Sequence, residues 1–112
     1  MDKEVQKACV YIEKNFKNPG LSPDSICRDL ITGKAFLEAL FSQELGISVE
    51  LFITHVRINK ARILMEKRPD IDAATAAGET GFTNTGEFCA AFKEITGATF
   101  EGYYEEQAGH AR

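Results

Sequence analysis

Residues 37–48 read LEALFSQELGIS and residues 88–99 read FCAAFKEITGAT, so one pattern occurs twice, 51 positions apart. Phe41 and Phe92 are each followed five residues later by a glycine, and two residues after that by a hydroxyl residue. A glycine in that place ends a helix in the left-handed conformation, and serine or threonine then caps the next helix. The repeat predicts two copies of a helix-turn-helix unit, each a short helix, a tight turn and a longer helix.

The sequence before the first copy also has helical periodicity. Apolar residues recur every three or four positions up to about Phe16, which predicts a first helix. Ser22 followed by Pro23 predicts the start of a second helix that ends near Leu30. The third predicted helix covers about residues 33–45, and its expected inner side consists of Phe36, Leu37, Leu40, Phe41 and Leu45.

A long helix is predicted between the two copies. Ser48 caps it, and it runs to about residue 67. Twenty residues at 1.5 Å each give about 30 Å, close to the roughly 34 Å between successive major grooves on one face of a duplex. Its expected inner stripe consists of Phe52, Val56, Ile58, Ala61, Leu64 and Met65.

The second half repeats the arrangement of the first. Asp72 caps a short helix that stops at Gly81, and Thr83 or Asn84 opens a sixth helix at about 84–95. Thr99 caps a last short helix, and no segment has the alternation of a strand. We therefore predict one all-α domain of about seven helices over residues 1–112, with a first subdomain at about 3–47, a linker helix at about 48–67, a second subdomain at about 70–104 and a tail at 105–112.

Composition excludes several classes of protein. The 112 residues include no apolar run of the roughly 18 residues that a membrane span needs, and the N-terminus lacks a signal core, so we expect a cytoplasmic protein without membrane contact. Three cysteines argue against a disulfide framework. His55 and His110 lack the spacing of metal ligands. We expect no metal, no cofactor and no catalysis.

The residues that carry the repeat also carry a family resemblance, because the chain resembles the AraC-type helix-turn-helix domain over about residues 4–104. The resemblance implies a bacterial transcription regulator that places two recognition helices in consecutive major grooves of double-stranded DNA, as a monomer. Members often have a separate ligand-binding domain, and we expect no ligand switch within this chain. The matching stretches are YIEKNF at 11–16, LS at 21–22, ELGIS at 44–48, RINKA at 57–61 with Leu64, and GFTN at 81–84 continuing through Phe88 and Phe92 to Thr96-Gly97 and Tyr103.

The resemblance implies that DNA contacts come from the outward residues of the helices at about 33–45 and 84–95, with one residue of the linker helix. The family usually has arginine where this chain has Ala39 and Ala90, and residues 33–44 and 83–94 each carry a net charge of −1. Glu38 would need a cytosine amino group or would repel the backbone. The candidate DNA-contacting residues are Lys34, Ala35, Glu38, Ser42, Arg57, Asn84, Thr85, Gly86, Cys89 and Lys93.

Two functions remain open at this point. The first is a DNA-binding regulator, in which short polar side chains and helix N-termini contact phosphate. Alternatively, the chain is a protein-interaction module that kept the scaffold and binds RNA polymerase or another regulator through the small residues around Ala35, Ala39, Gly86 and Ala90. The net charge of −4 favours the second function, and the bipartite architecture favours the first.

Three further expectations concern the linker helix and the second half. Residues 57–68 carry a net charge of +4, which predicts either intramolecular pairs or a strip that contacts phosphate, and Arg57 either ties helices together or touches the DNA backbone. Cys89 is expected on an outward face. Ala73 and Ala76 stand where the family has larger aliphatic residues, so we expect the second half to be the less stable one.

Overall fold

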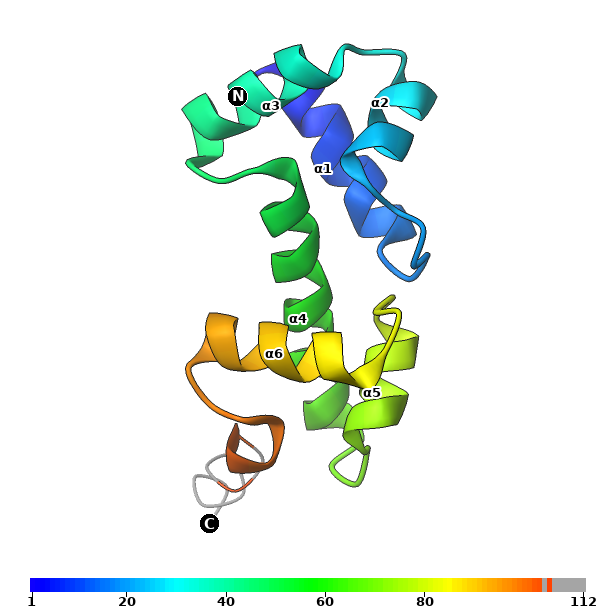
Figure 1. The fold of residues 1–112 in the computed structure, drawn as a ribbon, viewed down its shortest axis with the longest axis vertical. Coiled ribbons are helices and arrows are strands. Elements are labelled where there is room, and N and C mark those ends of the chain that lie inside the picture. The colour runs from blue at the N-terminus through cyan, green and yellow to red at the C-terminus, as the bar shows by residue number, and fades with distance from the viewer. Residues whose placement is uncertain (104, 106–112) are drawn as a thin grey trace. The chain divides into compact units, whose positions relative to one another are not determined.

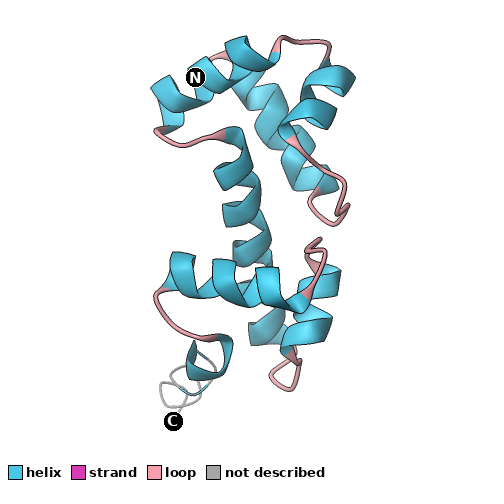
Figure 2. Cartoon of the chain, in the orientation of Figure 1, coloured by secondary structure: helices cyan, strands magenta, loops and turns pink. Residues whose placement is uncertain are grey.

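The computed structural model describes residues 1–103 and 105, and no strand occurs among them (Figure 1, Figure 2). A further helical turn follows at residues 100–103, where the Gly102 amide donates to Thr99 Oγ1 over 3.0 Å. The predicted all-α fold is confirmed, and all but residue 105 of the predicted tail lies outside the described residues. The helices are α1 (Lys3–Asn15), α2 (Pro23–Leu30), α3 (Lys34–Leu45), α4 (Val49–Lys67), α5 (Ala73–Glu79) and α6 (Thr85–Thr96).

The chain forms two compact units, Met1–Val56 and Arg57–Arg112, and the boundary between them falls inside α4. In the first unit α1, α2 and α3 pack against one another, as Figure 1 shows. In the second unit α5 packs against α6. Each unit therefore contains a helix pair, α2 with α3 or α5 with α6, of the kind that the repeat predicts.

The structure confirms the repeat at the ends of α3 and α6. Both helices have 12 residues, and both of their ends are 51 positions apart. Gly46 and Gly97 end them with φ angles of 73° and 81°, and their amides donate to the carbonyls of Ser42 and Lys93. Left-handed backbone is nearly free of steric cost only for glycine, which explains why the pattern has this residue there twice.

Side-chain caps begin α2, α5 and α6, as the sequence predicts. Ser22 and Ser25 form a reciprocal capping box at the start of α2. Asp72 accepts from the Thr75 amide over 2.7 Å, and this hydrogen bond lowers the pKa of the Asp72 carboxyl. Of the two candidates for the start of α6, Asn84 is the cap, since its Oδ1 accepts from the Glu87 amide over 2.8 Å.

Each unit has its own apolar core, and α4 contributes to both. One expectation about inward-facing residues is wrong: Phe36 is 55% exposed, while Leu37 and Phe41 of the same helix are buried as expected. Phe52 and Val56 of α4 are half-buried and pack against the first core, as the predicted stripe has them. The predicted stripe lacks Val49 and Ile53, which are the buried residues of this part of α4. The inward-facing side of α4 changes along the helix because its two parts belong to separate cores. The first core consists of Val5, Ala8, Ile12, Leu21, Ile26, Cys27, Leu37, Phe41, Val49 and Ile53. The second core consists of Ile58, Ala61, Met65, Ile71, Ala76, Ala77, Phe88, Phe92 and Phe100.

Ile31, in the turn between α2 and α3, has a φ of 54° and is 91% exposed. Left-handed backbone costs about 1–2 kcal/mol for an L-residue, and a β-branched side chain is a marked outlier there. We expect Ile31→Gly to raise the free energy of unfolding by about 0.5–1 kcal/mol, after the entropy cost of glycine.

Chemical denaturation monitored by circular dichroism would measure this change. Ile31→Ala is the control, because it removes the same exposed branches but keeps Cβ and should gain less. A glycine variant less stable than the alanine variant would show that this turn is unstrained.

Candidate nucleic-acid interface

The predicted contact residues of α3 lie on one exposed face. Lys34, Ala35 and Ser42 are exposed and Glu38 is half-buried, at the spacings of three and four residues that bring side chains to one side of a helix. Gly33, before the first of them, caps the helix without a side-chain hydrogen bond. The face is small and polar, with one cation at its N-terminal end.

That cation has an acidic neighbour. Lys34 Nζ lies 3.1 Å from Asp24 Oδ1 on α2, and this contact raises the pKa of the Lys34 ammonium. Both side chains are largely exposed, so the pair is screened by solvent and contributes little to stability. A phosphate group could compete with Asp24 for this ammonium at little cost.

Glu38 has a structural role that the sequence analysis missed. Its Oε2 accepts from the Val49 amide over 3.3 Å, beside Ser48, whose Oγ accepts from the Leu51 amide over 3.0 Å. Both side chains thus cap α4, whose first amides have no partner within the helix. The structure thus gives the Glu38 carboxylate a contact at the start of α4, and its contact with DNA stays a prediction.

We expect Glu38→Ala to lower the free energy of unfolding by about 0.5–1 kcal/mol, because a carboxylate near a helix N-terminus is worth about that much. Thermal melting of the first unit would measure it. Glu38→Gln retains an oxygen that can accept the hydrogen bond, so its loss of unfolding free energy should be less than half of the loss in the alanine variant. Equal melting of the wild-type chain and the alanine variant would mean that Ser48 alone caps the helix.

The equivalent face of α6 has the same register. Thr85, Gly86 and Lys93 are exposed and occupy the places of Lys34, Ala35 and Ser42, each 51 positions later. Asn84, at the place of Gly33, is exposed and uses its Oδ1 as the helix cap. The structure thus brings Asn84, Thr85, Gly86 and Lys93 together at the surface of the second unit.

Cys89 does not lie on an open outward face as expected. Its side chain is half-buried against the second core, because α6 packs that part of its surface around Phe88 and Phe92. All three cysteines are free thiols, and burial is the main cause that raises the pKa of Cys9 and Cys27. A raised pKa leaves less reactive thiolate at neutral pH, in keeping with thiols that serve as packing residues.

Arg57 ties α4 to the turn before α6. Its guanidinium lies 5.9 Å from the centre of the Phe82 ring, within the range of a cation–π contact. Desolvation lowers the pKa of the Arg57 guanidinium, and the nearby Glu87 carboxylate opposes this effect. Of the two roles left open for Arg57, the structure favours the tie between elements.

Other cations of residues 57–68 also have partners inside the second unit. The Arg62 guanidinium lies 6.0 Å from the centre of the Tyr103 ring, and Arg68 pairs with Glu79 of α5. Arg62 and Arg68 are both exposed residues, so their side chains remain accessible to solvent. Of the two predictions for residues 57–68, these contacts favour intramolecular pairs over a strip that contacts phosphate.

Neither a metal centre nor a membrane-spanning helix is found in the part of the chain that the structure describes. Among residues 1–103 and 105, no three His, Cys, Asp or Glu side chains lie close enough together to hold a metal ion. In the same residues, no helix has the length and apolar character needed to cross a membrane.

Comparison with known proteins agrees with this fold and register. A family model described as a helix-turn-helix domain matches residues 19–106. The arabinose operon regulatory protein of Escherichia coli K12 is 31% identical over 99 residues, which are 88% of this chain and 34% of that protein. The uncharacterized transcriptional regulatory protein YesN of Bacillus subtilis is 31% identical over 107 residues, 94% of this chain and 29% of that protein. The chain thus spans about a third of the length of the curated relatives it matches.

Solved structures show the same architecture. The C-terminal domain of AraT, a response regulator from Geobacillus stearothermophilus, superposes with a TM-score of 0.88 at 28% identity, covering 94% of this chain and 86% of that chain. A Listeria innocua protein of unknown function gives a TM-score of 0.80 at 27% identity, covering 90% and 94%. Because the family model and the curated relatives cover most of the sequence, the chain belongs to the AraC-type helix-turn-helix family of transcription regulators.

Proposed function

We propose that this domain binds a specific duplex DNA sequence by placing α3 and α6 in adjacent major grooves. The observation that carries the proposal is the equivalence of these two helices, which have the same length, the same glycine C-caps and the same exposed register 51 positions apart. Two equivalent exposed faces in one chain suit two successive half-sites. AraC-type domains take part in DNA-binding regulation, which supports the general activity.

The length of α4 supports adjacent grooves. Its 19 residues correspond to about 28 Å of helix, and successive major grooves on one side of a duplex are about 34 Å apart. We therefore propose that one chain, with one reading helix in each unit, contacts both grooves.

The charges of the two faces support modest affinity. Lys34 on α3 and Lys93 on α6 are the exposed cations of these faces, and the whole chain has a net charge of −4. Neutralised phosphates supply most non-specific affinity, so few cations predict weak binding to random DNA and a small salt dependence. Sequence preference would then come from short polar side chains, with Ser42 and Thr85 able to reach base edges.

Selection from a pool of random duplexes, followed by titration of the chosen duplex at about 50 to 200 mM salt, tests the proposal. We expect the selected duplex to bind at least about a thousandfold more tightly than a scrambled one. Lys93→Ala should lower the salt slope by about one, while Lys67→Ala, a matched change outside the two faces, should change it less. No enrichment, or a salt slope near zero, would reject the proposal.

One observation favours a protein-interaction module as the second candidate. The helices α3 and α6 each carry two acidic side chains and one basic side chain, and their exposed faces include the small residues Ala35, Ala39, Gly86 and Ala90. Such surfaces suit close packing against a helix of a regulator or of RNA polymerase. Binding to purified RNA polymerase that withstands nuclease, and that Ala39→Arg with Ala90→Arg abolishes, would favour this function over the first.

A further inference from the structure

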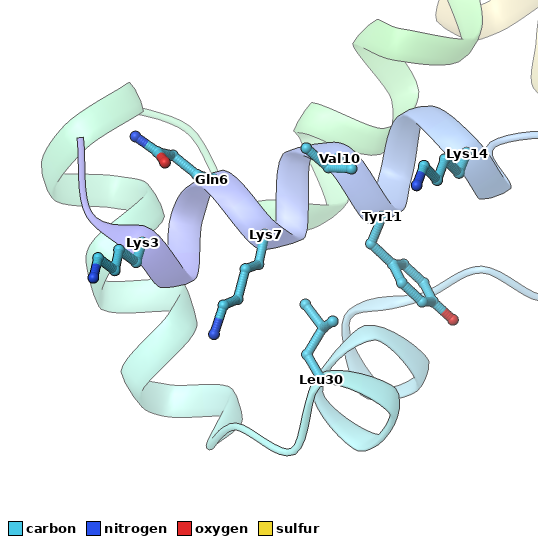
Figure 3. A pocket seen from close by; sticks show the side chains of 7 residues that line it. All are labelled: Lys3, Gln6, Lys7, Val10, Tyr11, Lys14 and Leu30. Atoms are coloured by element: carbon cyan, nitrogen blue, oxygen red, sulfur yellow. The ribbon is translucent and has the colours of Figure 1, made fainter.

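A groove on the first unit lies away from the exposed residues of α3 that form the candidate interface. It is an open depression of about 560 Å³ along the outer side of α1, next to the end of α2 (Figure 3). Lys3, Lys7 and Lys14 line it from α1, together with the apolar groups of Val10, Tyr11 and Leu30. The groove therefore combines an apolar centre with basic residues.

The apolar side chains at the centre of the groove are exposed to solvent at least in part. Val10 is 53% exposed although it lies in the middle of α1, and Leu30 at the end of α2 is half-buried beside the first core. Exposed apolar surface with a polar rim is typical of binding sites for other molecules. The Tyr11 ring adds an amphipathic group, and its hydroxyl is held by the Asp29 carboxylate.

The lysines have a regular register. Lys3, Lys7, Tyr11 and Lys14 follow one another at spacings of four, four and three residues, so they share one side of α1. The stripe is about 16 Å long, which is three helical turns. No acidic side chain is among the residues that line the groove. Acidic groups do flank it: Glu4 lies 3.6 Å from Lys7, Asp29 is engaged by Tyr11, and Asp2 and Glu13 adjoin Lys3 and Lys14 in the sequence. Lys3 and Lys14, at the two ends of the stripe, frame the apolar centre.

We propose that this groove docks an acidic amphipathic segment of a partner protein. The segment is about three helical turns long, with apolar side chains over Val10 and Leu30 and carboxylates toward Lys3 and Lys14. Charge complementarity selects an acidic occupant, and the apolar centre selects a peptide over a phosphate backbone, which gains nothing from Val10 or Leu30. The proposal is independent of DNA binding by α3 and α6, since those faces contribute nothing to the groove.

Amide NMR of the isotope-labelled chain tests this proposal with a synthetic peptide. The peptide has about 15 residues, leucines in its central turn and glutamates at both ends. Signals of residues 3–14 and 30 should shift, and a scrambled peptide of equal composition should have less effect. Lys3→Gln with Lys14→Gln should weaken binding about threefold to tenfold, whereas the matched pair Lys17→Gln with Lys67→Gln should not. Val10→Ser retains every charge and should weaken binding at least as much.

Three outcomes would overturn the proposal. These are absence of shifts up to about 1 mM peptide, equal shifts with the scrambled peptide, and equal weakening by the two lysine pairs. A random duplex that shifts residues 3–14 when the peptide does not would assign the lysines to phosphate contact instead. Because α3 and α6 lie outside the readout, failure here leaves the duplex selection unaffected, and the reverse also holds.

Discussion

Phe88→Ala is expected to unfold the second unit, because it should lower the free energy of unfolding of that unit by about 3–5 kcal/mol. The side chain is fully buried. Its ring lies 5.4 Å from that of Phe82 and 5.7 Å from those of Phe92 and Phe100, measured between centroids. Removal of the ring therefore leaves a cavity in the centre of an aromatic cluster and removes three ring contacts.

The neighbouring residues offer little to fill that cavity. Ala76 and Ala77 are buried in the same core and have no side-chain length to spare. Whole domains have about 5–15 kcal/mol of stability, so half of such a chain has roughly 2.5–7.5 kcal/mol, and a loss of about 3–5 kcal/mol removes most of it. The small alanines also support the prediction that this unit is the less stable of the two.

Amide hydrogen exchange, read separately for residues 3–53 and 58–103, would measure the effect. We expect protection to be lost in the second range and retained in the first. Phe36→Ala is the matched control, since this phenylalanine is 55% exposed and its loss should cost less than about 0.5 kcal/mol. Retained protection of α6 in Phe88→Ala would show that the aromatic cluster is not what holds the unit together.

Arginine at positions 39 and 90 is expected to strengthen duplex binding by about tenfold or more for each substitution. Ala39 and Ala90 are both exposed, on α3 and α6, and occupy equivalent places 51 positions apart. A bidentate contact between arginine and guanine is worth about 1–3 kcal/mol, and each added phosphate contact raises the salt slope by about 0.9. The two effects should multiply, because distant sites act independently.

Titration of a random-duplex pool with the two single variants and the double variant would measure this. Ala74→Arg is the control, because Ala74 is an exposed helical alanine of α5 and the change adds the same charge outside both faces. A response to Ala90→Arg without one to Ala39→Arg would mean that α6 alone enters a groove. Equal responses to all three arginines would reduce the effect to net charge and remove the support for reading helices.

The sequence alone determined the helices and their repetition. Glycines at 46 and 97, together with the caps Ser22 and Asp72, set helix ends through contacts with residues three or four positions away. Such contacts are local, so the residue types and their spacing suffice to predict them. The family resemblance rests on the same spacings, which is why it located α3 and α6 correctly.

Only the tertiary structure decided what the side chains on those helices contact. It turned Glu38 to the amide of Val49, eleven positions away, placed Arg57 over Phe82, and left Val10 and Phe36 exposed. Each of these outcomes depends on which elements pack together and at what angle, and helical periodicity carries no such information. The physical reason is that capping follows from neighbours in the chain, whereas burial and charge pairing follow from neighbours in space.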